Sequence, residues 1–459
     1  MEQTKKTVLF VTSPEHGQAN SHLAVISALQ AKYGDSLDIH VSSFELLRKR
    51  VPGKVTFDPL VGKGLVEYYN VTGTSAADAP PLTLHDVTTR PGLLGAVVAA
   101  QKILQIIHPE SPEEYLAAAQ SVEALIDALD PDLIVVDTLF SAARDAIVRK
   151  GREHVLLSPN TLKENTEADQ GAGVFFLPYT GIGYPYPLPW YLVIPNAIMY
   201  LFTAIWIFFL DPRYKALCRI RHANGYPDKM PLFDKRSATV LCMSTPALEF
   251  PGIIPPDVIC CGPFLQASQP EPEGEIFHWT AQAPTVLVAL GSHWRMDAEA
   301  AHDMLVALRV LMEKRKDRWR SRGLRIVQWL DVDPIALLRT GHVVCVVNHG
   351  GSNSYHEALA TGTPQVILSP WFDCHDFGIR AEWLGIGKWG NKHTAPKISQ
   401  KEVSKALLTV VGATPGSCEA GEIYRKAKKA AEIVKEYQGG RGGSEVAADY
   451  IWDLVKKSK

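Results

Sequence analysis

The sequence predicts an α/β protein with two domains, each built on a parallel β-sheet. Short apolar segments alternate with segments of helical spacing in both halves of the 459-residue chain. The short segments are apolar along their whole length, which is typical of strands covered by helices on both faces. A stretch rich in proline, glutamate and glycine, residues 262–284, lies between the halves and has the composition of a linker.

The first half begins with the apolar run Val8–Val11, which we expect to form a strand. After a polar turn, Leu23, Ile26 and Leu29 share one face of a predicted helix. The same alternation predicts two further strands, at Asp38–Val41 and Leu133–Val136.

After the linker, the alternation of strands and helices starts again. Apolar runs predict strands at Thr285–Leu290, Arg325–Leu330, Val343–Val347 and Gln365–Leu368. Helical spacing predicts helices at Ala298–Met312, Ser354–Thr361 and Glu445–Lys456. We therefore expect a first domain at residues 1–265, a linker at 266–282, a second domain at 283–438 and a C-terminal helical segment at 439–459.

The composition argues against several classes of protein. Apolar residues make up 46% of the chain and charged residues 21%, which are ordinary globular values. With 47 Lys and Arg against 49 Asp and Glu, there is no excess of positive charge to attract nucleic acid. The seven cysteines form no Cys-x-x-Cys pair, so we expect reduced thiols and no bound metal. The start MEQTKKTVLFVTSP lacks the long apolar core of a signal peptide, which predicts a cytoplasmic protein.

The segment from residue 343 to 390 carries the most informative pattern. An apolar strand ends just before His349, and two glycines follow that let the backbone turn close to a ligand. Ser352–Ser354 then open a helix, whose free N–H groups and positive dipole end favour an anion such as a phosphate. Glu357 lies one turn further and is suited to accept hydrogen bonds from ribose hydroxyls. Ser354 and Glu357 also have the spacing of a capping box, which would explain both residues without a ligand.

A second polar loop follows the next predicted strand. Gly362-Thr-Pro364 and the run Gln365–Leu368 lead into a loop that carries Asp373 and Cys374. Because the carboxyl ends of neighbouring parallel strands meet at one edge of a sheet, we expect both loops at one nucleotide-binding edge.

Together these residues resemble the signature of the inverting UDP-dependent glycosyltransferases with two Rossmann-like domains, the GT-B type, and most closely their fungal branch. The strings NHGGSNS and WFDCHDF carry this resemblance. It implies that His349 and the amides of Ser352–Ser354 bind the diphosphate, that Glu357 binds the ribose, and that Asp373 binds sugar hydroxyls. The donor-binding residues that it implies, with Trp329 stacked on uracil, are Gly291, Ser292, Trp329, His349, Gly351, Ser352, Asn353, Ser354, Glu357, Asp373 and Cys374.

The family resemblance also implies a general base, a histidine in the loop after the first strand, supported by an aspartate at the end of a later strand. Asp137 matches that aspartate, with a helix N-cap as its alternative role. Gln18 stands where the family has its histidine, and an amide cannot act as a base at neutral pH. The expected base is therefore His16, with His22 and Glu15 as alternatives.

Residues 190–210 form a run of 21 residues without a charge, long enough to cross a membrane. Three interpretations remain open: a transmembrane helix, a buried helix pair that lines an apolar acceptor cleft, and an interfacial helix pair that dips into a membrane. The last two are compatible with each other. In the second interpretation, the residues expected to line the cleft are Trp190, Met199, Phe202 and Trp206.

The resemblance implies transfer of a hexose, by default glucose, with inversion, from a UDP-sugar to a hydroxyl of a lipophilic small molecule such as a terpenoid, polyketide, sterol or lipid. No metal or other cofactor is expected, because a helix dipole and amides can stabilise the leaving UDP. A UDP-sugar epimerase on the same fold and a non-catalytic nucleotide-sugar-binding protein are the alternative functions. We expect a monomer or a weak dimer without a nucleic-acid partner.

Overall fold

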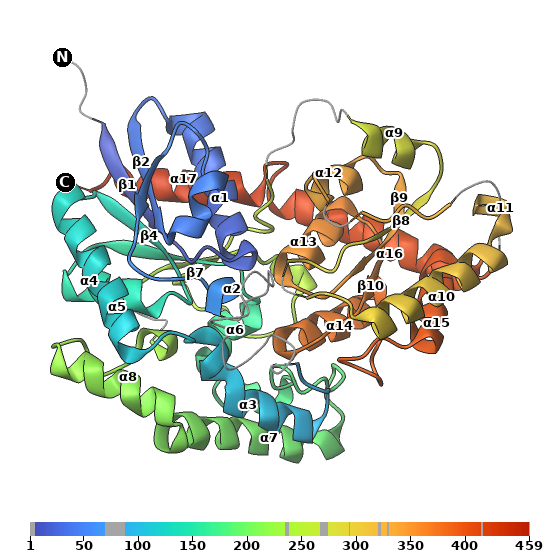
Figure 1. Cartoon of the computed structure of the whole chain (residues 1–459), viewed down its shortest axis with the longest axis horizontal. Coiled ribbons are helices and arrows are strands. Elements are labelled where there is room, and N and C mark those ends of the chain that lie inside the picture. Colours follow the sequence, from blue (N-terminus) through green and yellow to red (C-terminus); the bar gives the residue numbers. More distant parts are fainter. Residues whose placement is uncertain are drawn as a thin grey trace.

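The computed structural model describes residues 5–68, 88–234, 238–266, 274–292, 294–319, 323–327, 330–414 and 416–458. The described residues form two parallel β-sheets with helices packed against them, one sheet in each half of the view in Figure 1. The predicted α/β fold class, with two parallel-sheet domains, is confirmed.

The first sheet has seven strands in the order β3-β2-β1-β4-β5-β6-β7. Its centre is formed by β1 (Lys6–Val11) and β4 (Leu133–Asp137), which pair in parallel. The other strands are β2 (Leu37–Ser43), β3 (Thr56–Pro59), β5 (His154–Ser158), β6 (Val240–Cys242) and β7 (Val258–Cys260). Because all of them are parallel, the loops after β1, β4 and β5 leave from one edge of the sheet.

The helices of this domain cover both faces of the sheet because consecutive strand residues point to opposite faces and both sets are apolar. Val8 and Val135 pack with α1 on one face, and Leu9 and Val136 pack with α4 and α5 on the other. The helices are α1 (His16–Tyr33), α2 (Leu65–Tyr68), α3 (Leu93–Ile107), α4 (Pro112–Leu129), α5 (Ser141–Arg149), α6 (Leu162–Thr166), α7 (Trp190–Ile205) and α8 (Pro212–Ala223).

The second sheet has four described strands in the order β11-β10-β9-β8. They are β8 (Thr285–Val288), β9 (Val343–Asn348), β10 (Gln365–Ile367) and β11 (Gly387–Trp389). The helices of this half are α9 (Glu275–Ala281), α10 (Ala298–Lys314), α11 (Lys316–Trp319), α12 (Pro334–Arg339), α13 (Ser352–Thr361), α14 (Phe372–Leu384), α15 (Gln400–Val411) and α16 (Cys418–Tyr437).

The last helix, α17 (Gly443–Val455), returns to the first domain and packs against α1 (Figure 1). Ile451 and Val455 are fully buried in the same apolar cluster as Leu23 and Ile26 of α1. Glycines at 439 and 440, both with positive φ, lie between α16 and α17 and let the chain turn there.

Two expectations from the sequence differ from the structure. The strand expected at Arg325–Leu330 is wrong over its described part, because residues 323–327 have no regular structure and Ile326 is 74% exposed. Trp329 lies outside the described residues. Within the range expected for the linker, α9 forms a helix whose Phe277 is buried against Leu337 and Leu338 of the second domain.

Residues 190–210 form α7 followed by a short π-helical turn, η5 (Trp206–Leu210). These elements run with α3 and α8 along one edge of the molecule (Figure 1). Their mean hydropathy is 2.0, and with their length this would allow them to cross a membrane. Only 17% of this apolar segment is buried inside the protein. Apolar side chains on α7 and η5 are therefore exposed, at Trp190, Tyr191, Ile194, Ile198, Leu201, Ile205, Phe209 and Leu210.

Candidate active site

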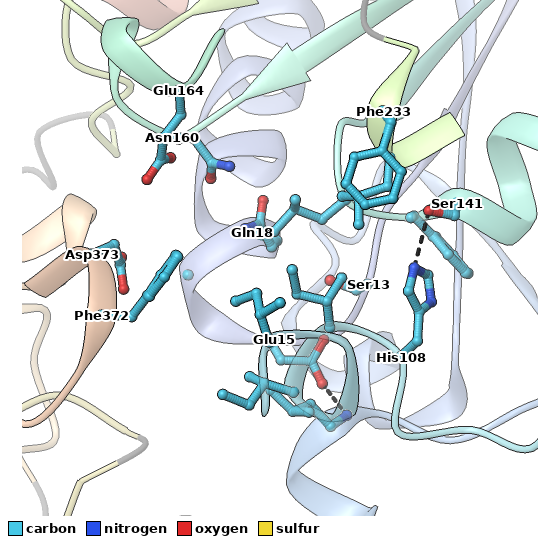
Figure 2. A pocket seen from close by; sticks show the side chains of 18 of the residues that line it. Ser13, Glu15, Gln18, His108, Ser141, Asn160, Glu164, Phe233, Phe372 and Asp373 are labelled. Carbon is cyan, nitrogen blue, oxygen red and sulfur yellow. Dashed lines mark hydrogen bonds between the residues drawn. The ribbon is translucent and has the colours of Figure 1, made fainter. Parts of the chain in front are cut away.

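A cavity of about 940 Å³ lies between the two domains. The first domain lines it with residues that follow β1, β4 and β5, and the second domain with residues that follow β9 and β10. Figure 2 shows Ser13, Glu15 and Gln18 near the start of α1 opposite Phe372 and Asp373 of α14. Strand ends from both sheets thus meet at one site, as expected for nucleotide-binding α/β proteins.

The turn between β9 and α13 has the geometry of an anion site. The Gly350 amide donates to Asn348 Oδ1 at 2.8 Å, and Gly350 has φ +83, a conformation that favours glycine. A Cβ at Gly350 would come within 2.8 Å of the Cys374 carbonyl oxygen, so the two predicted loops approach each other closely here. The helix begins at Ser352 with Gly351 as its N-cap, and no side chain of a described residue caps it. Its first amides therefore remain available to a ligand.

The capping-box interpretation of Ser354 and Glu357 is thereby excluded, because Ser354 lies inside the helix and not at its N-cap. Glu357 is half-buried. Burial, and then the nearby Asp333, raise the pKa of Glu357 to about 8, while Arg339 acts in the opposite direction.

The imidazole ring of His349 lies between Gly291 and Gly351, beside the turn between β9 and α13. A Cβ at Gly291 would come within 2.5 Å of His349 Cε1, and a Cβ at Gly351 would also contact the imidazole ring. Gly291, with φ +78, thus brings the loop after β8 against His349, and Ser292 follows it in the same loop. His349, Gly351 and Ser352 line the cavity.

Side chains at the start of α13 also join the two domains. Ser352 Oγ donates to the Pro159 carbonyl at 2.5 Å. Asn353 Nδ2 donates to the carbonyls of His16 and Gly17, at 3.1 and 3.2 Å. The N-termini of α1 and α13 therefore face each other across the cleft, which directs two positive dipole ends toward the same space.

Asp373 and Cys374 occupy the first turn of α14 and line the same cavity. Burial, and then the charges of Glu164 and Asp376, raise the pKa of Asp373 to about 8. Cys374 is buried, and its burial raises the pKa of the thiol well above its ordinary value. The thiol is therefore an unreactive one at neutral pH.

Asp137 lies at the end of β4 and is completely buried. Its Oδ1 accepts a hydrogen bond from the Leu139 amide at 2.9 Å, and its Oδ2 accepts one from Ser13 Oγ at 3.2 Å. Burial raises the pKa of Asp137 to about 6. The N-cap interpretation is excluded, because α5 begins at Ser141 with Phe140 in the cap position.

The histidines expected near Asp137 do not reach the cavity wall. His16 is the first residue of α1, is half-buried, and is not among the described residues that line the cavity. His22 is buried one turn after Gln18, with Nδ1 at 3.1 Å from the Gln18 carbonyl oxygen, and burial lowers its pKa to about 4. Gln18 and Glu15 do line the cavity, and Glu15 accepts a hydrogen bond from the Leu65 amide (Figure 2).

Sequence reasoning missed a histidine–carboxylate pair that does line the cavity. His108 Nδ1 lies 2.8 Å from Glu110 Oε1, and His108 Nε2 lies 3.3 Å from Ser141 Oγ (Figure 2). His108 caps the C-terminus of α3, in a part of the chain where no sequence motif marks it. Only its approach to α5 in the fold brings these three side chains together.

The acceptor end of the cavity is lined by α7 and η5, but not by the residues expected. Tyr200, Thr203, Ala204, Ile207 and Phe208 line it. Their spacing of three and four residues places them on one helix face, about 100° from the face that carries positions 199, 202 and 206.

The four residues that we expected to line the cleft therefore have other surroundings. Trp190 is 85% exposed at the start of α7. Met199 is buried against Ala96 and Ile182, and the rings of Phe202 and Trp206 stack on each other at 6.2 Å.

Known proteins share this architecture. No family model matches the chain. The glycosyltransferase sdnJ of Sordaria araneosa is 31% identical to it over 503 aligned residues, which cover 96% of this chain and 97% of that protein. A solved UDP-glucosyltransferase from Polygonum tinctorium matches with a TM-score of 0.64 at 14% identity, over 99% of this chain and 100% of that one. The solved glycotransferase of kitacinnamycin matches with a TM-score of 0.63 at 15% identity, over 98% and 100% of the two chains.

The structural matches establish the two-domain fold, and the full-length relative establishes the kind of enzyme. The chain therefore belongs to the same glycosyltransferase family as sdnJ, and it has the two-domain GT-B fold of the solved UDP-glucosyltransferase.

Proposed function

We propose that the protein transfers a hexose, by default glucose, from a UDP-sugar to a hydroxyl of a lipophilic small molecule, with inversion at the anomeric carbon. The observation that carries this proposal is a single cavity whose two ends differ in chemistry. One end holds His349 and the first turn of α13, and the other is walled by apolar side chains of α3 and η5. A charged donor and an apolar acceptor can therefore occupy the same cavity.

The donor end supports a nucleoside diphosphate. Two helix N-termini and His349 converge there, and they would stabilise the negative charge that develops on the leaving UDP. In this proposal Glu357 accepts hydrogen bonds from the ribose, Asp373 from the sugar hydroxyls, and Trp329 stacks on uracil. These main-chain and side-chain groups supply the electrostatic stabilisation, so the proposed reaction uses no further cofactor.

The other end of the cavity supports a lipophilic acceptor. Branched and aromatic side chains gather there from α3, η5 and the segment after α8, at Ile103, Ile106, Ile107, Ile207, Phe208 and Leu232. Contact with such walls favours ligands with a large apolar surface. The solved Polygonum tinctorium enzyme is capable of glucosylating indoxyl, so this fold can accommodate transfer to a small aromatic acceptor.

We further propose that a cytoplasmic pool of the protein contacts membranes peripherally through residues 190–210. The outward face of α7 and η5 is an uncharged apolar stripe, as on helices that lie in a membrane interface. The opposite face of the same helix lines the acceptor end of the cavity. A lipophilic acceptor dissolved in the bilayer would thus be separated from the cavity by one helix.

The proposed function is tested by incubating the protein with UDP-glucose and a panel of apolar alcohols and phenols, with UDP release and product mass as readouts. We expect UDP release that depends on the acceptor and a product heavier by one hexose. His349→Ala should reduce turnover at least about 100-fold. His393→Ala, at an exposed turn that does not line the described cavity, should retain full turnover.

Two other outcomes would contradict the proposal. Turnover of UDP-N-acetylglucosamine without an acceptor would identify an epimerase. Tight UDP binding without transfer to any acceptor or from any UDP-sugar would identify a binding protein.

A further inference from the structure

The cavity lacks a histidine at the position where the family has its base. Gln18 occupies that position, and its side chain points into the cavity (Figure 2). Gln18 Oε1 is buried and accepts no hydrogen bond from any residue that the structure describes. An amide at this position cannot remove the proton of an acceptor hydroxyl.

Most other titratable groups near Gln18 are engaged or turned away. Glu15 accepts a hydrogen bond from the Leu65 amide at the start of α2, and it also interacts with the Ser13 hydroxyl. His22 lies in the interior of the domain with its Nδ1 against a backbone carbonyl. His108 is held between Glu110 and Ser141, on the side of the cavity away from Asp373 (Figure 2).

Ser13 and Asp137 form a hydrogen-bonded pair directly beside Gln18. Ser13 lines the cavity, close to Gln18 in Figure 2. Asp137 has no exposed surface and is not among the described residues that line the cavity. The Leu139 amide fixes Asp137 Oδ1, and Oδ2 accepts from Ser13 Oγ. Because Asp137 is shielded from the cavity, an acceptor cannot give its proton to the carboxylate directly. The Ser13 hydroxyl contacts both the cavity and Asp137, so it can pass the proton on.

We propose that Ser13 and Asp137 act as a proton relay that replaces the histidine base. The acceptor oxygen forms a bond to the anomeric carbon while the bond from that carbon to the phosphate oxygen breaks, and the electron pair of that bond leaves with UDP. The acceptor proton passes to Ser13 Oγ, and the Ser13 proton passes to Asp137 Oδ2. When the products leave, the proton returns from Asp137 Oδ2 through Ser13 Oγ to water that enters the cavity. This inference rests on the proposed transfer from a UDP-sugar.

The surroundings of Asp137 suit a proton acceptor near neutral pH. Burial, with a smaller contribution from the charge of Glu15, raises its pKa to about 6, and hydrogen bonds from Leu139 and Ser13 oppose that rise. Arg144 of α5 is the cation that interacts with Asp137. Asp137 is therefore ionised above pH 6 and protonated below it, so turnover should fall as the pH falls through 6.

The test compares two acceptors that carry the same aromatic ring. One presents an aliphatic hydroxyl group, and the other is a thiophenol whose thiol is ionised at pH 8. An ionised thiolate needs no base, so only the alcohol reaction depends on the relay. We expect Asp137→Asn and Ser13→Ala to lower kcat at least about 100-fold for the alcohol and less than about 10-fold for the thiophenol. Ser13→Thr, which keeps the hydroxyl, should restore most of the alcohol activity and the fall near pH 6.

UDP binding by calorimetry, unchanged in all variants, shows that each variant is folded. If Asp137→Asn fails to fold, the Ser13→Ala and Ser13→Thr pair decides the question. Equal losses with both acceptors, or full alcohol activity in Ser13→Ala, would overturn the relay. So would a selective loss of the alcohol reaction in His108→Gln, which would assign the base to His108. Absence of transfer by the wild-type protein would instead overturn the proposed function.

Discussion

Gly350 and Asp373 are two residues of the site whose conformation or environment lowers the stability of the folded protein. Gly350 adopts a left-handed backbone conformation with φ +83 beside the Cys374 carbonyl. Asp373 keeps a carboxyl group in a cavity near two other acidic side chains. Both features position groups for a ligand at a cost in stability.

Replacement of Gly350 by alanine should destabilise the protein by about 3 kcal/mol, from backbone strain and from contact of the new methyl with the Cys374 oxygen and Ile367. It should also weaken UDP binding by displacing the amides of α13. Gly416→Ala is the matched control, because Gly416 has a similar φ of +76 and open space around it. Urea unfolding and UDP calorimetry measure both effects, and equal behaviour of the two variants would contradict this role for Gly350.

Asp373→Asn should stabilise the protein at pH 8 while it abolishes transfer. The pKa of Asp373 is raised from the ordinary 3.8 to about 8. Between these values the folded protein retains a proton that the unfolded chain has released, so the carboxyl lowers stability increasingly as the pH rises. We expect a gain of about 2 kcal/mol at pH 8 and little change at pH 4, by thermal unfolding.

The control for that variant is Asp453→Asn, at an exposed ion pair with Lys456 on α17, which should change neither stability nor turnover measurably. A gain for Asp373→Asn that is the same at pH 4 and pH 8 would show that its cause is not the buried carboxyl.

At the scale of elements, α7 and η5 form a helix with two different apolar faces. One face lines the cavity with Tyr200 and Ile207, and the other exposes Ile194, Ile198 and Leu201. Apolar composition in the sequence suggested a wall of the acceptor cleft as one of three interpretations of this segment. It could not show which face turns inward, because both faces are apolar and the helical period alone does not distinguish them.

We expect the wild-type protein to co-sediment with phospholipid vesicles and Ile194→Glu with Ile198→Glu to abolish this binding. Two charges on the exposed stripe would oppose insertion into the interface. Transfer to a water-soluble acceptor should be retained, because neither residue lines the described cavity. Leu305 is also an exposed apolar residue, 42% exposed on α10, so Leu305→Glu serves as the control and should leave vesicle binding unchanged. If the double variant and Leu305→Glu both lose vesicle binding, or if neither does, a specific contact through α7 is refuted.

The strands show the same division between what composition reveals and what it cannot. Val343–Val347 is apolar throughout because both faces of β9 are covered, and the sequence predicted it almost to its ends. The run Arg325–Leu330 looks similar, yet its described part lies exposed outside the sheet. An apolar run signals burial only where the rest of the fold supplies a covering layer.

At the scale of the whole molecule, buried ion pairs connect α14 of the second domain to the first domain. Lys163 of α6 forms an ion pair with Asp376 of α14, and both side chains are buried. Arg380 of α14 pairs with Glu249 of the first domain at 2.9 Å, and both are also buried. These contacts and those of Asn353 fix the relative position of the donor and acceptor ends of the cavity.

Removal of one partner should therefore be costly. Asp376→Asn would leave Lys163 buried beside a neutral group, and we expect a loss of about 4 kcal/mol by urea unfolding. The double variant Lys163→Met with Asp376→Leu should recover most of that loss. Glu422→Gln, at an exposed pair with Lys426, should have no measurable effect. A double variant as unstable as Asp376→Asn would show that packing, and not the unpaired charge, causes the loss.

The site itself was predictable where one continuous segment forms it. The residues from His349 to Cys374 belong to two neighbouring loops, and the structure brings both into the cavity. The groups around the proton transfer come from separate elements: Ser13 follows β1, Asp137 ends β4, and His108 ends α3. Their pairing depends on tertiary contacts, so a sequence pattern could suggest Asp137 but not its partner.

The account rests on a diphosphate held at the turn between β9 and α13, and the most direct test is a crystal structure of the protein with bound UDP. We predict the diphosphate oxygens within hydrogen-bond distance of the amides of Ser352–Ser354 and of His349, with the apolar end of the cavity still open. Density for UDP at any other place, with this turn unoccupied at saturating UDP, would contradict it.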